Sequence, residues 1–494
     1  VERARPPRHR ARRSGAKWLP PSDRRNLASG RGVLRVGSLG PLGAIFPTTQ
    51  MPRDLDVVVF GASGDTGIVG CCCLYFKGRK LGLSSWAPAA RNLGKLQKDL
   101  LDRLSAVEPG PDGLQPMAAI EADCDSHESL VRMCARATCV LTCAGPYYKY
   151  GEGVVRACIE AGTHYVDITG EVDWVDSMMQ KYGAEAEEKG VFVVSCAGYD
   201  SVPPDLATFL AAKTLEGEGE SLQRFEAFVA CSGGAMPHGT IETVCGMLAK
   251  SKGRALGAVT FGMLGGDTAQ EPSTPSASGD GLVPEAARGN LRSNLVRTIL
   301  PGYSSLAGGF CFPHMMAMIN LYIVHRTAAL EGYGGIEYRE RTGPAPSAKT
   351  LYGAVPTAVG VGIASAVGVV AAMPYACKLI RGVRDTINPP LQKKVRDAAL
   401  AGFASAGAIT LQGFGASASG RKSVRVDLES DQDAGLGFTM LSACTVAAEL
   451  AKKRAGSSES KYKGGFHTAV CAVGGAALAD ALKNVGVRID VAVA

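Results

Sequence analysis

The sequence predicts an α/β protein in which a parallel sheet is followed by a second α+β domain with a mixed or antiparallel sheet. Two observations carry this prediction. Between residues 54 and 205, short β-branched runs alternate with stretches of helical character, and this alternation is typical of β-α-β crossovers. After the Pro203-Pro204 pair, longer runs with polar alternation appear at 225–231 and 408–428. Such alternation is typical of antiparallel sheets with one solvated face.

The first predicted strand, residues 56–60, ends at a loop with glycine at every third position. The loop residues are Gly61, Ala62, Ser63, Gly64, Asp65, Thr66 and Gly67, and helical character begins at Ile68. Gly61 permits a tight turn, Gly64 lets backbone N–H groups approach a pyrophosphate, and Gly67 allows the helix to pack closely on the sheet. A helix N-terminus also attracts anions. This succession of strand, glycine loop and helix therefore predicts a Rossmann-type dinucleotide-binding domain. A glycine turn without a ligand is the structural alternative.

The remainder of this domain repeats the alternation. Further strands are predicted at 85–90, 117–122, 140–143, 165–168 and 191–195. The helices between them are predicted at 92–104, 126–137, 152–161 and 172–189. Right-handed crossovers of this kind produce one parallel sheet whose carboxyl ends line a ligand crevice.

Two residues that follow predicted strands bear on the choice of cofactor. An NAD-preferring domain usually has Asp or Glu at the end of the second strand, whereas this strand ends at Arg91. A guanidinium there can pair with a 2′-phosphate in a bidentate manner, so the sequence predicts NADP(H). An exposed arginine without that role is the alternative. Asp123, after the third strand, either faces the adenine or is an ordinary turn residue.

The turn after the fourth strand should lie beside the nicotinamide, because the carboxyl ends of parallel strands form the crevice. It consists of Ala144, Gly145 and Pro146. Tyr147 and Tyr150 follow directly and are the candidate catalytic proton donors. A bound water in that role, and a packing role for either tyrosine, remain open alternatives.

Positive charge gathers at the beginning of the sequence. The formal net charge is +7, but the first 50 residues hold 11 of the 53 basic and 2 of the 46 acidic residues. The remainder is nearly neutral and has no basic stripe, which argues against a nucleic-acid partner. We expect residues 1–53 to be a disordered or targeting segment. Their Arg-rich, acid-poor composition resembles an organelle transit peptide, and an extension ahead of a true start at Met51 is the alternative.

Cysteines and apolar runs give two further expectations. The 15 cysteines include no C-x-x-C pair, so we predict a reducing compartment and no metal site. Residues 350–377 contain no charged side chain. The densest part, 357–373, would span roughly 26 Å as a helix, slightly less than a hydrocarbon core of about 30 Å. It is predicted either to associate with a membrane or lipid surface or to be a buried or interface helix.

Five motifs in fixed order carry a family resemblance. They lie at 57–67, 90–91, 143–152, 164–171 and 198–205. Together they resemble the saccharopine dehydrogenase-like oxidoreductases, a group that includes mycobacterial trans-acting enoyl reductases and animal lipid-droplet-associated members. The likeness is dense over residues 54–210 and thin from there to the C-terminus.

The resemblance implies an NADP-binding Rossmann domain over 54–205 and an α+β substrate- or lipid-facing domain over 206–455. It also favours membrane association of residues 350–377, and it leaves 456–494 as a C-terminal segment that is expected to return to the Rossmann domain. One departure concerns Asn320, Tyr322 and His325, which stand where members of the group tend to have charged residues. The polar contacts of the substrate pocket are therefore expected to differ, and this leaves catalysis open.

Two functions follow from these observations. The first is an NADP(H)-dependent reductase of a hydrophobic, lipid-like substrate, because the second domain is rich in Ala, Gly, Val and Met. The second is a non-catalytic protein of a membrane or lipid-droplet surface that binds NADP(H) structurally, as a homodimer or as a subunit of a larger assembly. The expected location is intracellular and membrane-associated. It is mitochondrial or plastid if the first 50 residues are a transit peptide, and otherwise cytosolic or on lipid droplets.

Overall fold

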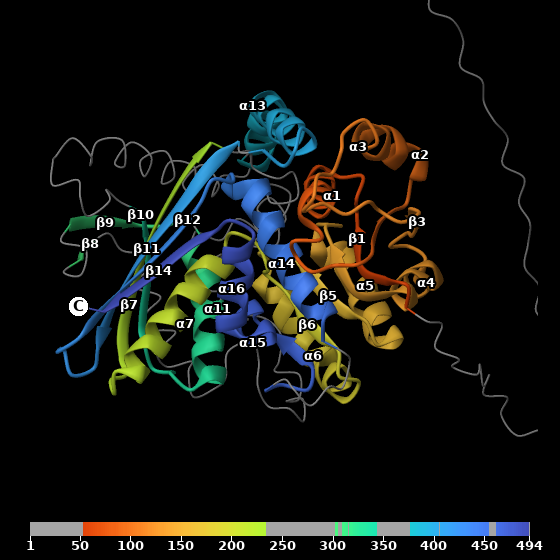
Figure 1. The fold of residues 1–494 in the computed structure, drawn as a ribbon. Coiled ribbons are helices and arrows are strands. Elements are labelled where there is room, and N and C mark those ends of the chain that lie inside the picture. The colour runs from red at the N-terminus through yellow and green to blue at the C-terminus, as the bar shows by residue number, and fades with distance from the viewer. Residues whose placement is uncertain are drawn as a thin grey trace, which may run out of the picture. The chain divides into compact units, whose positions relative to one another are not determined.

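The computed structural model describes residues 53–233, 302–304, 309–314, 316–342, 376–404, 406–453 and 461–493. In this part of the chain the strands form two sheets of seven strands each (Figure 1). One sheet is parallel throughout and the other is mixed. The predicted α/β class with a second sheet of mixed or antiparallel type is therefore confirmed.

The parallel sheet has the strand order β13-β6-β5-β4-β1-β2-β3. Its strands are β1 (Leu55–Phe60), β2 (Trp86–Ala90), β3 (Ile120–Glu121), β4 (Ala137–Thr142), β5 (His164–Asp167), β6 (Phe192–Val194) and β13 (Gly465–His467). The direction of winding reverses between β1 and β4, and in open α/β sheets the ligand crevice lies at that point. β1 and β2 are almost entirely buried, which explains their continuous apolar sequence.

The helices of this half connect successive parallel strands. They are α1 (Asp65–Lys77), α2 (Leu93–Leu96), the π-helical turn η1 (Gln97–Leu101), α3 (Asp102–Leu104), α4 (His127–Arg136), α5 (Tyr147–Ala161) and α6 (Val172–Glu188). Leu96, Leu100 and Leu104 are buried along one side of the α2-η1-α3 run. Leu93, the first residue of α2, is 36% exposed.

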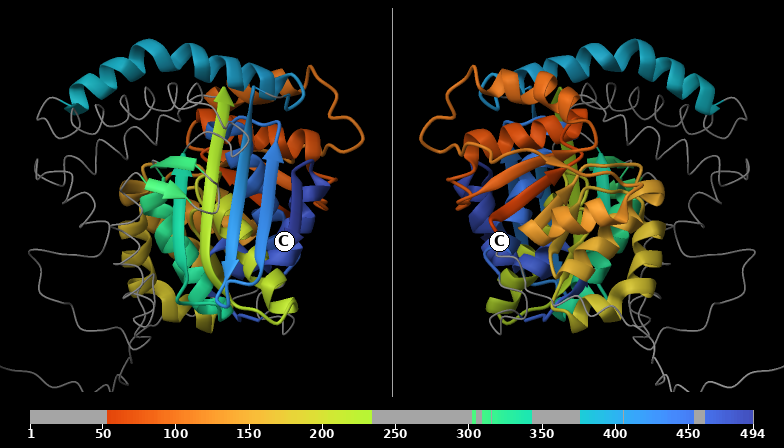
Figure 2. Two further views of the ribbon diagram at one scale, coloured as in Figure 1. Left: turned by 90° about the vertical axis from the view of Figure 1, so that its left-hand side faces the viewer. Right: turned by 90° about the vertical axis from the view of Figure 1, so that its right-hand side faces the viewer.

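The mixed sheet has the order β14-β12-β11-β7-β10-β9-β8. The strands are β7 (Leu222–Gly233), β8 (Gly302–Ser304), β9 (Gly309–Pro313), β10 (Glu337–Thr342), β11 (Gly407–Ser417), β12 (Ser423–Ser430) and β14 (Arg488–Val493). β7 pairs in parallel with β10, whereas the other neighbours are antiparallel. Figure 2 shows the long strands β7, β11 and β12 side by side. The alternating burial along β11 and β12 explains the polar alternation in their sequences.

The remaining helices of the described residues come from distant parts of the sequence. They are α7 (Val202–Gly217), α11 (Ala317–Glu331), α13 (Ala376–Leu400), the π-helical turn η2 (Ala434–Phe438), α14 (Thr439–Ala451), α15 (Ala469–Val473) and α16 (Gly475–Asn484). α7 contacts β7, β11 and β12, while α14 contacts β1, β4 and β5 of the parallel sheet. α14 and α7 both contact α16.

The last part of the chain contributes to both sheets. β13 pairs with β6 at the edge of the parallel sheet, and β14 pairs with β12 at the edge of the mixed sheet. Within the described residues one helical stretch, Ala434–Ala451, is long and apolar enough to cross a membrane, with a mean hydropathy of 1.4. However, 83% of it is buried inside the protein, as in the core helix of a globular protein.

Several predicted elements have different bounds in the structure. The third strand is only Ile120–Glu121, so the prediction of a strand from 117 was wrong. The helix predicted to begin at 152 begins at Tyr147. The physical reason is that the Glu171 carboxylate accepts hydrogen bonds from the backbone N–H groups of Tyr147 (3.1 Å) and Tyr148 (2.7 Å). These contacts satisfy first-turn donors that would otherwise have no partner.

Two predictions fall largely outside the described residues. They concern residues 1–52 of the predicted targeting segment and nearly all of the hydrophobic stretch 350–377, of which only the last two residues belong to α13. These stay predictions.

Replacing the carboxylate that caps α5 should destabilise the protein. The Glu171→Gln variant keeps the shape of the side chain but removes its charge, and we expect a loss of about 1 kcal/mol in the free energy of unfolding. Urea unfolding measures this loss. Glu128→Gln is the control, because Glu128 forms an exposed pair with Arg132 on α4 that should contribute less than about 0.5 kcal/mol. Equal effects of the two substitutions would contradict the capping role.

Candidate active site

The glycine loop between β1 and α1 has two glycines that the fold itself requires. Gly61 has a φ of +82°, and a Cβ there would lie 3.0 Å from the backbone nitrogen of Ala144. A Cβ at Gly67 would lie 2.2 Å from the carbonyl oxygen of Gly61. No side chain fits at that distance. These two positions therefore bring the first turn of α1 against the loop and the loop against the turn after β4.

Gly64 differs from Gly61 and Gly67, because the packing of the fold does not require a glycine there. It has an extended backbone (φ −89°, ψ 162°) at the N-cap of α1, and it is exposed. A Cβ there would make only an ordinary contact of 3.4 Å with the carbonyl oxygen of Gly61. Nothing within the described chain requires glycine at this position. A ligand that approaches the backbone closely would require it, and a pyrophosphate at a helix N-terminus does so.

The other loop residues surround the start of α1. Ala62 is buried, and its N–H donates to the carbonyl oxygen of Ala89 at 3.1 Å. Ser63, Asp65 and Thr66 are half-buried. The carboxylate of Asp65 pairs with Arg396 of α13, with Oδ1 and Nη1 3.1 Å apart. This guanidinium offsets a negative charge in the helix turn where a phosphate would bind.

Arg91 and Asp123 lie close together at the ends of β2 and β3. Arg91 Nε is 3.9 Å from Asp123 Oδ2, and 73% of the Arg91 side chain is exposed. Its guanidinium is thus accessible to a 2′-phosphate. Asp123 also acts as a turn residue, because its Oδ1 accepts a hydrogen bond from the N–H of Asp125 (3.1 Å) ahead of α4. The adenine-facing role predicted for Asp123 stays a prediction.

The turn formed by Ala144, Gly145 and Pro146 leads directly into α5, with Pro146 at the N-cap. The hydroxyl of Tyr147 is buried and donates to the carbonyl oxygen of Thr142 at 2.9 Å. Burial raises the pKa of Tyr147 well above its usual value. The hydroxyl proton of Tyr147 is thus bound to a carbonyl oxygen of β4. This arrangement favours a packing role for Tyr147 over a catalytic role. Tyr150 is half-buried, with Lys149 Nζ 4.7 Å from its ring centre.

Asp167 holds the carboxyl ends of β5 and β6 together. Its carboxylate accepts hydrogen bonds from the hydroxyls of Tyr165 (2.8 Å) and Ser195 (2.9 Å) and from the backbone N–H groups of Thr169 (3.0 Å) and Cys196 (3.1 Å). Burial nevertheless raises the pKa of Asp167 to about 6. Because all four donors bond to it, the Asp167 carboxyl group fixes the ends of β5 and β6 at the edge of the ligand crevice.

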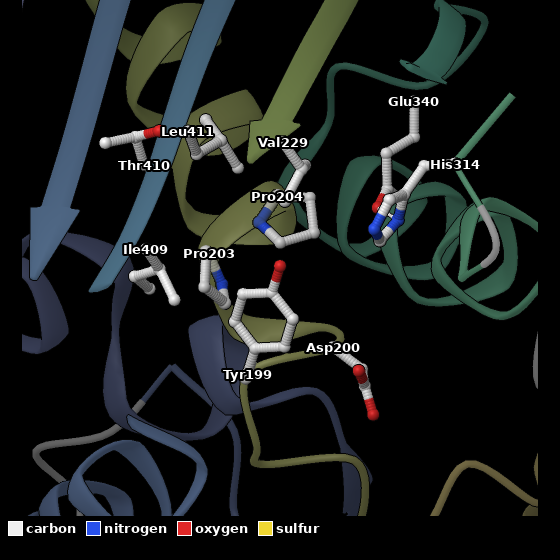
Figure 3. Close-up of a pocket in the computed structure, with 10 residues that line it drawn as sticks. All are labelled: Tyr199, Asp200, Pro203, Pro204, Val229, His314, Glu340, Ile409, Thr410 and Leu411. Atoms are coloured by element: carbon white, nitrogen blue, oxygen red, sulfur yellow. Dashed lines mark ion pairs between the residues drawn. The ribbon is translucent and has the colours of Figure 1, made fainter. Parts of the chain in front are cut away.

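A pocket that the sequence analysis missed lies where the chain leaves the parallel sheet for the mixed sheet (Figure 3). It is small: its cavity volume of about 10 Å³ has room for about one water molecule. The lining residues are Tyr199, Asp200, Pro203, Pro204, Val229, His314, Glu340, Ile409, Thr410 and Leu411. They come from the turn before α7 and from α7, β7, β10, β11 and the residue after β9.

Two acidic groups and one imidazole meet in this pocket. His314 Nδ1 lies 2.6 Å from Glu340 Oε1, and Glu340 is almost fully buried. Burial raises the pKa of Asp200 to about 6. Burial opposes protonation of His314, but the carboxylates of Glu340 and Asp200 outweigh it and raise the pKa of the imidazole above its usual value.

A hydrogen-bonded chain fixes the second oxygen of Glu340. Glu340 Oε2 accepts from Asn320 Nδ2 at 2.8 Å and from the hydroxyl of Tyr338 at 3.0 Å. Asn320 Oδ1 in turn accepts from the hydroxyl of Ser201 at 2.9 Å. Asn320 is completely buried. The departure at position 320 therefore supports the pocket, because the neutral amide bridges Ser201 and Glu340 without adding a charge.

The other two departures do not reach this pocket. The hydroxyl of Tyr322 is buried, with no hydrogen-bond partner in the described part of the chain. His325 is completely buried, and desolvation lowers its pKa to about 4. Both belong to the core around α11. In the described residues no group of three or more His, Cys, Asp or Glu side chains has the arrangement of a metal site.

Comparison with known proteins identifies one domain within the first half of the chain. Residues 58–194 match the family described as "Saccharopine dehydrogenase NADP binding domain". The chain carries a saccharopine dehydrogenase-type NADP-binding domain. The predicted NADP-binding domain of this family and the predicted NADP(H) cofactor are thus confirmed, and the matched range includes the glycine loop, Arg91 and the turn after β4.

Individual relatives of this NADP-binding domain cover part of the chain. A lipid droplet localized protein of Caenorhabditis elegans is 38% identical over 205 residues, which are 41% of this chain and 47% of that protein. A saccharopine dehydrogenase-like oxidoreductase of Bos taurus is 36% identical over 185 residues, 37% of this chain and 42% of that protein. The aligned segments thus span less than half of these relatives.

Two further likenesses extend beyond the NADP-binding domain. A protein of Mycobacterium tuberculosis named as a trans-acting enoyl reductase is 31% identical over 287 residues, 57% of this chain and 62% of that protein. The solved apo saccharopine dehydrogenase (L-Glu forming) of Saccharomyces cerevisiae is 13% identical and covers 89% of this chain and 99% of its own, with a TM-score of 0.45.

Alanine at two loop glycines should separate cofactor binding from folding. Gly64→Ala should weaken NADPH binding at least about tenfold, or about 1.4 kcal/mol, with an unchanged thermal midpoint, because only a ligand needs the space. Gly67→Ala should lower the free energy of unfolding by about 1–3 kcal/mol, since its Cβ meets Gly61. Fluorescence titration and thermal unfolding measure the two effects. A Gly64→Ala protein with full NADPH affinity would overturn this assignment.

Replacing Arg91 should remove the preference for NADPH. The Arg91→Gln variant loses charge-assisted hydrogen bonds to the 2′-phosphate, and we expect NADPH binding to weaken by roughly 1.5–3 kcal/mol while NADH binding is unchanged. The same titration with both cofactors checks this. Arg132→Gln on α4 is the control, and an equal loss in both variants would show only a general charge effect.

Proposed function

We propose that the protein is an NADPH-dependent reductase of a hydrophobic, lipid-like substrate. The observation that carries this proposal is the pairing of an NADP-type glycine loop with a pocket whose walls are mostly apolar. Pro203, Pro204, Val229, Ile409 and Leu411 supply these walls. Reduced NADP supplies a hydride when bound. The chain must then provide a binding surface for the substrate, exclusion of water and a proton.

The charges around the pocket favour an uncharged reacting group. Its lining in the described part of the chain contains the carboxyl groups of Asp200 and Glu340 and no lysine or arginine. An acidic substrate such as a dicarboxylic amino acid would meet like charges there, and the imidazole of His314 is already paired with Glu340. An alkyl chain with a conjugated carbonyl has no such conflict. The name of the Mycobacterium tuberculosis relative is in keeping with this class of substrate.

A second function is supported by a different observation. The relative from Caenorhabditis elegans is named for its place on lipid droplets, and the aligned segment includes 41% of this chain. A protein of a lipid surface that binds NADP(H) without turnover would carry the same loop and the same Arg91. In that case the predicted segment 350–377 would provide the association with lipid, in a homodimer or a larger assembly.

Turnover distinguishes the two functions. The full chain, in detergent micelles, is incubated with NADPH and a panel of long-chain enoyl esters, and NADPH consumption is followed by absorbance. The reductase proposal predicts consumption with at least one enoyl ester and none with a lysine–glutamate conjugate. Binding of NADPH without consumption across the panel would contradict it and support the second function.

A further inference from the structure

The first turn of α1 has amide donors without partners. In the described part of the chain, no hydrogen bond is made by the backbone N–H groups of Asp65, Thr66 and Gly67. The first bond of the helix runs from the N–H of Ile68 to the carbonyl oxygen of Gly64, at 2.8 Å. The N-cap Gly64 has no side chain that could accept from the three amides. An anion would satisfy them, and the pyrophosphate of NADP(H) is the anion that this domain binds.

The same turn also carries a negative charge. Asp65 is the first residue of α1, and its short side chain keeps the carboxylate close to the backbone of the turn. A phosphate bound by the amides therefore lies near a like charge, which disfavours binding. A cation that contacts both groups would remove this conflict.

Arg396 of α13 is such a cation. Its Nη1 lies 3.1 Å from Asp65 Oδ1, and 31% of the Arg396 side chain is exposed. Nε and Nη2 make no hydrogen bond within the described residues. A guanidinium has five N–H donors, so the pair with Asp65 leaves most of them free. Because Asp65 belongs to the turn itself, these free donors lie near the amides that would hold the phosphate.

The packing of α13 determines where Arg396 lies. Val395 and Ala399, one helical turn apart, are buried, and α13 contacts α1 (Figure 1). Asp397 pairs with Arg103 of α3, with Oδ1 and Nη2 2.9 Å apart. Two consecutive residues of α13 thus pair with two helices of the NADP-binding half. The guanidinium of Arg396 is therefore held at the loop before any cofactor binds.

This end of α13 has more positive charge than its neighbours neutralise. Residues 391–400 contain three basic side chains and one acidic side chain. The acidic one, Asp397, is already paired with Arg103. Lys393, one turn before Arg396, is exposed and forms no ion pair with any residue that the structure describes. The surplus positive charge favours an anion at the loop.

We propose that Arg396 is a ligand of the cofactor pyrophosphate, contributed from outside the family-matched range of residues 58–194. Nη1 neutralises Asp65, and the donors that Asp65 leaves free bind the phosphates beside the first amides of α1. The inference rests on NADP(H) binding alone, so it holds for both functions proposed above. NADPH and NADH share the pyrophosphate. Arg396 therefore contributes affinity for both cofactors, whereas Arg91 distinguishes them.

Fluorescence titration of the full chain with NADPH and NADH tests this assignment. We expect Arg396→Gln to weaken the binding of both cofactors roughly tenfold, because it removes charge-assisted hydrogen bonds to a phosphate. Arg103→Gln is the matched control. It removes the adjacent exposed ion pair of α13 and should change either affinity by less than about twofold. Equal losses in the two variants, or full affinity of Arg396→Gln, would overturn the proposal.

A double-mutant cycle with Asp65 separates phosphate binding from simple neutralisation. Asp65→Asn removes the charge that Arg396 offsets and should tighten NADPH binding. In the Asp65→Asn background, Arg396→Gln should still weaken NADPH binding roughly tenfold, since the contact with the phosphate is lost in both backgrounds. Disappearance of the loss in that background would show that Arg396 only neutralises Asp65, and would overturn the proposal.

Adenosine 2′-monophosphate provides a readout that lacks the pyrophosphate. Calorimetric titration should show weaker binding of this nucleotide to Arg91→Gln and unchanged binding to Arg396→Gln. A similar loss in Arg396→Gln would indicate a general effect of positive charge on anions and would contradict direct contact with the pyrophosphate.

Discussion

The contact of Gly67 with Gly61 is the constraint on which the cofactor half depends. With 2.2 Å between the position of a Cβ at Gly67 and the carbonyl oxygen of Gly61, any side chain would push α1 away from the loop. The close packing directs the first turn of α1 at the switch point between β1 and β4. The amides of that turn then face the crevice, and the partial positive charge of the helix N-terminus is available to a phosphate. Gly64 has no side chain and so leaves room for the phosphate to approach these amides.

Buried carboxylates hold other parts of the fold in place. Asp167 ties together the ends of β5 and β6, and Glu171 caps α5. Glu340 collects Asn320, Tyr338 and His314 around one carboxylate. Each of these three carboxylates accepts hydrogen bonds from several donors, as a low-dielectric interior requires. The His314–Glu340 pair lines the pocket of Figure 3, whereas Asp167 and Glu171 hold the framework around the parallel strands.

The parts of the fold that were predictable depend on local rules. The glycine loop follows a buried strand and precedes a helix, so its turn, its close packing and its ligand could be inferred from a few neighbouring residues. Arg91 was predictable for the same reason, because it directly follows β2. The start of α5 was not, since the carboxylate that caps it belongs to Glu171, more than twenty residues along the chain. Propensity within the segment 147–151 gives no sign of that partner.

The pocket could not be predicted from sequence because its parts come from positions 199 to 411. His314 is a single histidine between apolar residues, and its partner Glu340 lies in a charged strand that resembles an exposed edge. Asn320 was noticed as a departure from the family pattern, but its function as a bridge between Ser201 and Glu340 depends on how α11 packs. The family resemblance drew attention to position 320, but it did not indicate what Asn320 does in the structure.

The transfer of a labelled hydride tests the central claim most directly. The full chain is incubated with NADPH carrying deuterium at C4 of the nicotinamide and with a long-chain enoyl ester, and the recovered lipid is examined by mass spectrometry. Reduction at this site predicts one deuterium at the β-carbon of the saturated product, together with a solvent-derived proton at the α-carbon. A lipid recovered without deuterium while NADPH is consumed, or no consumption at all, would contradict the account.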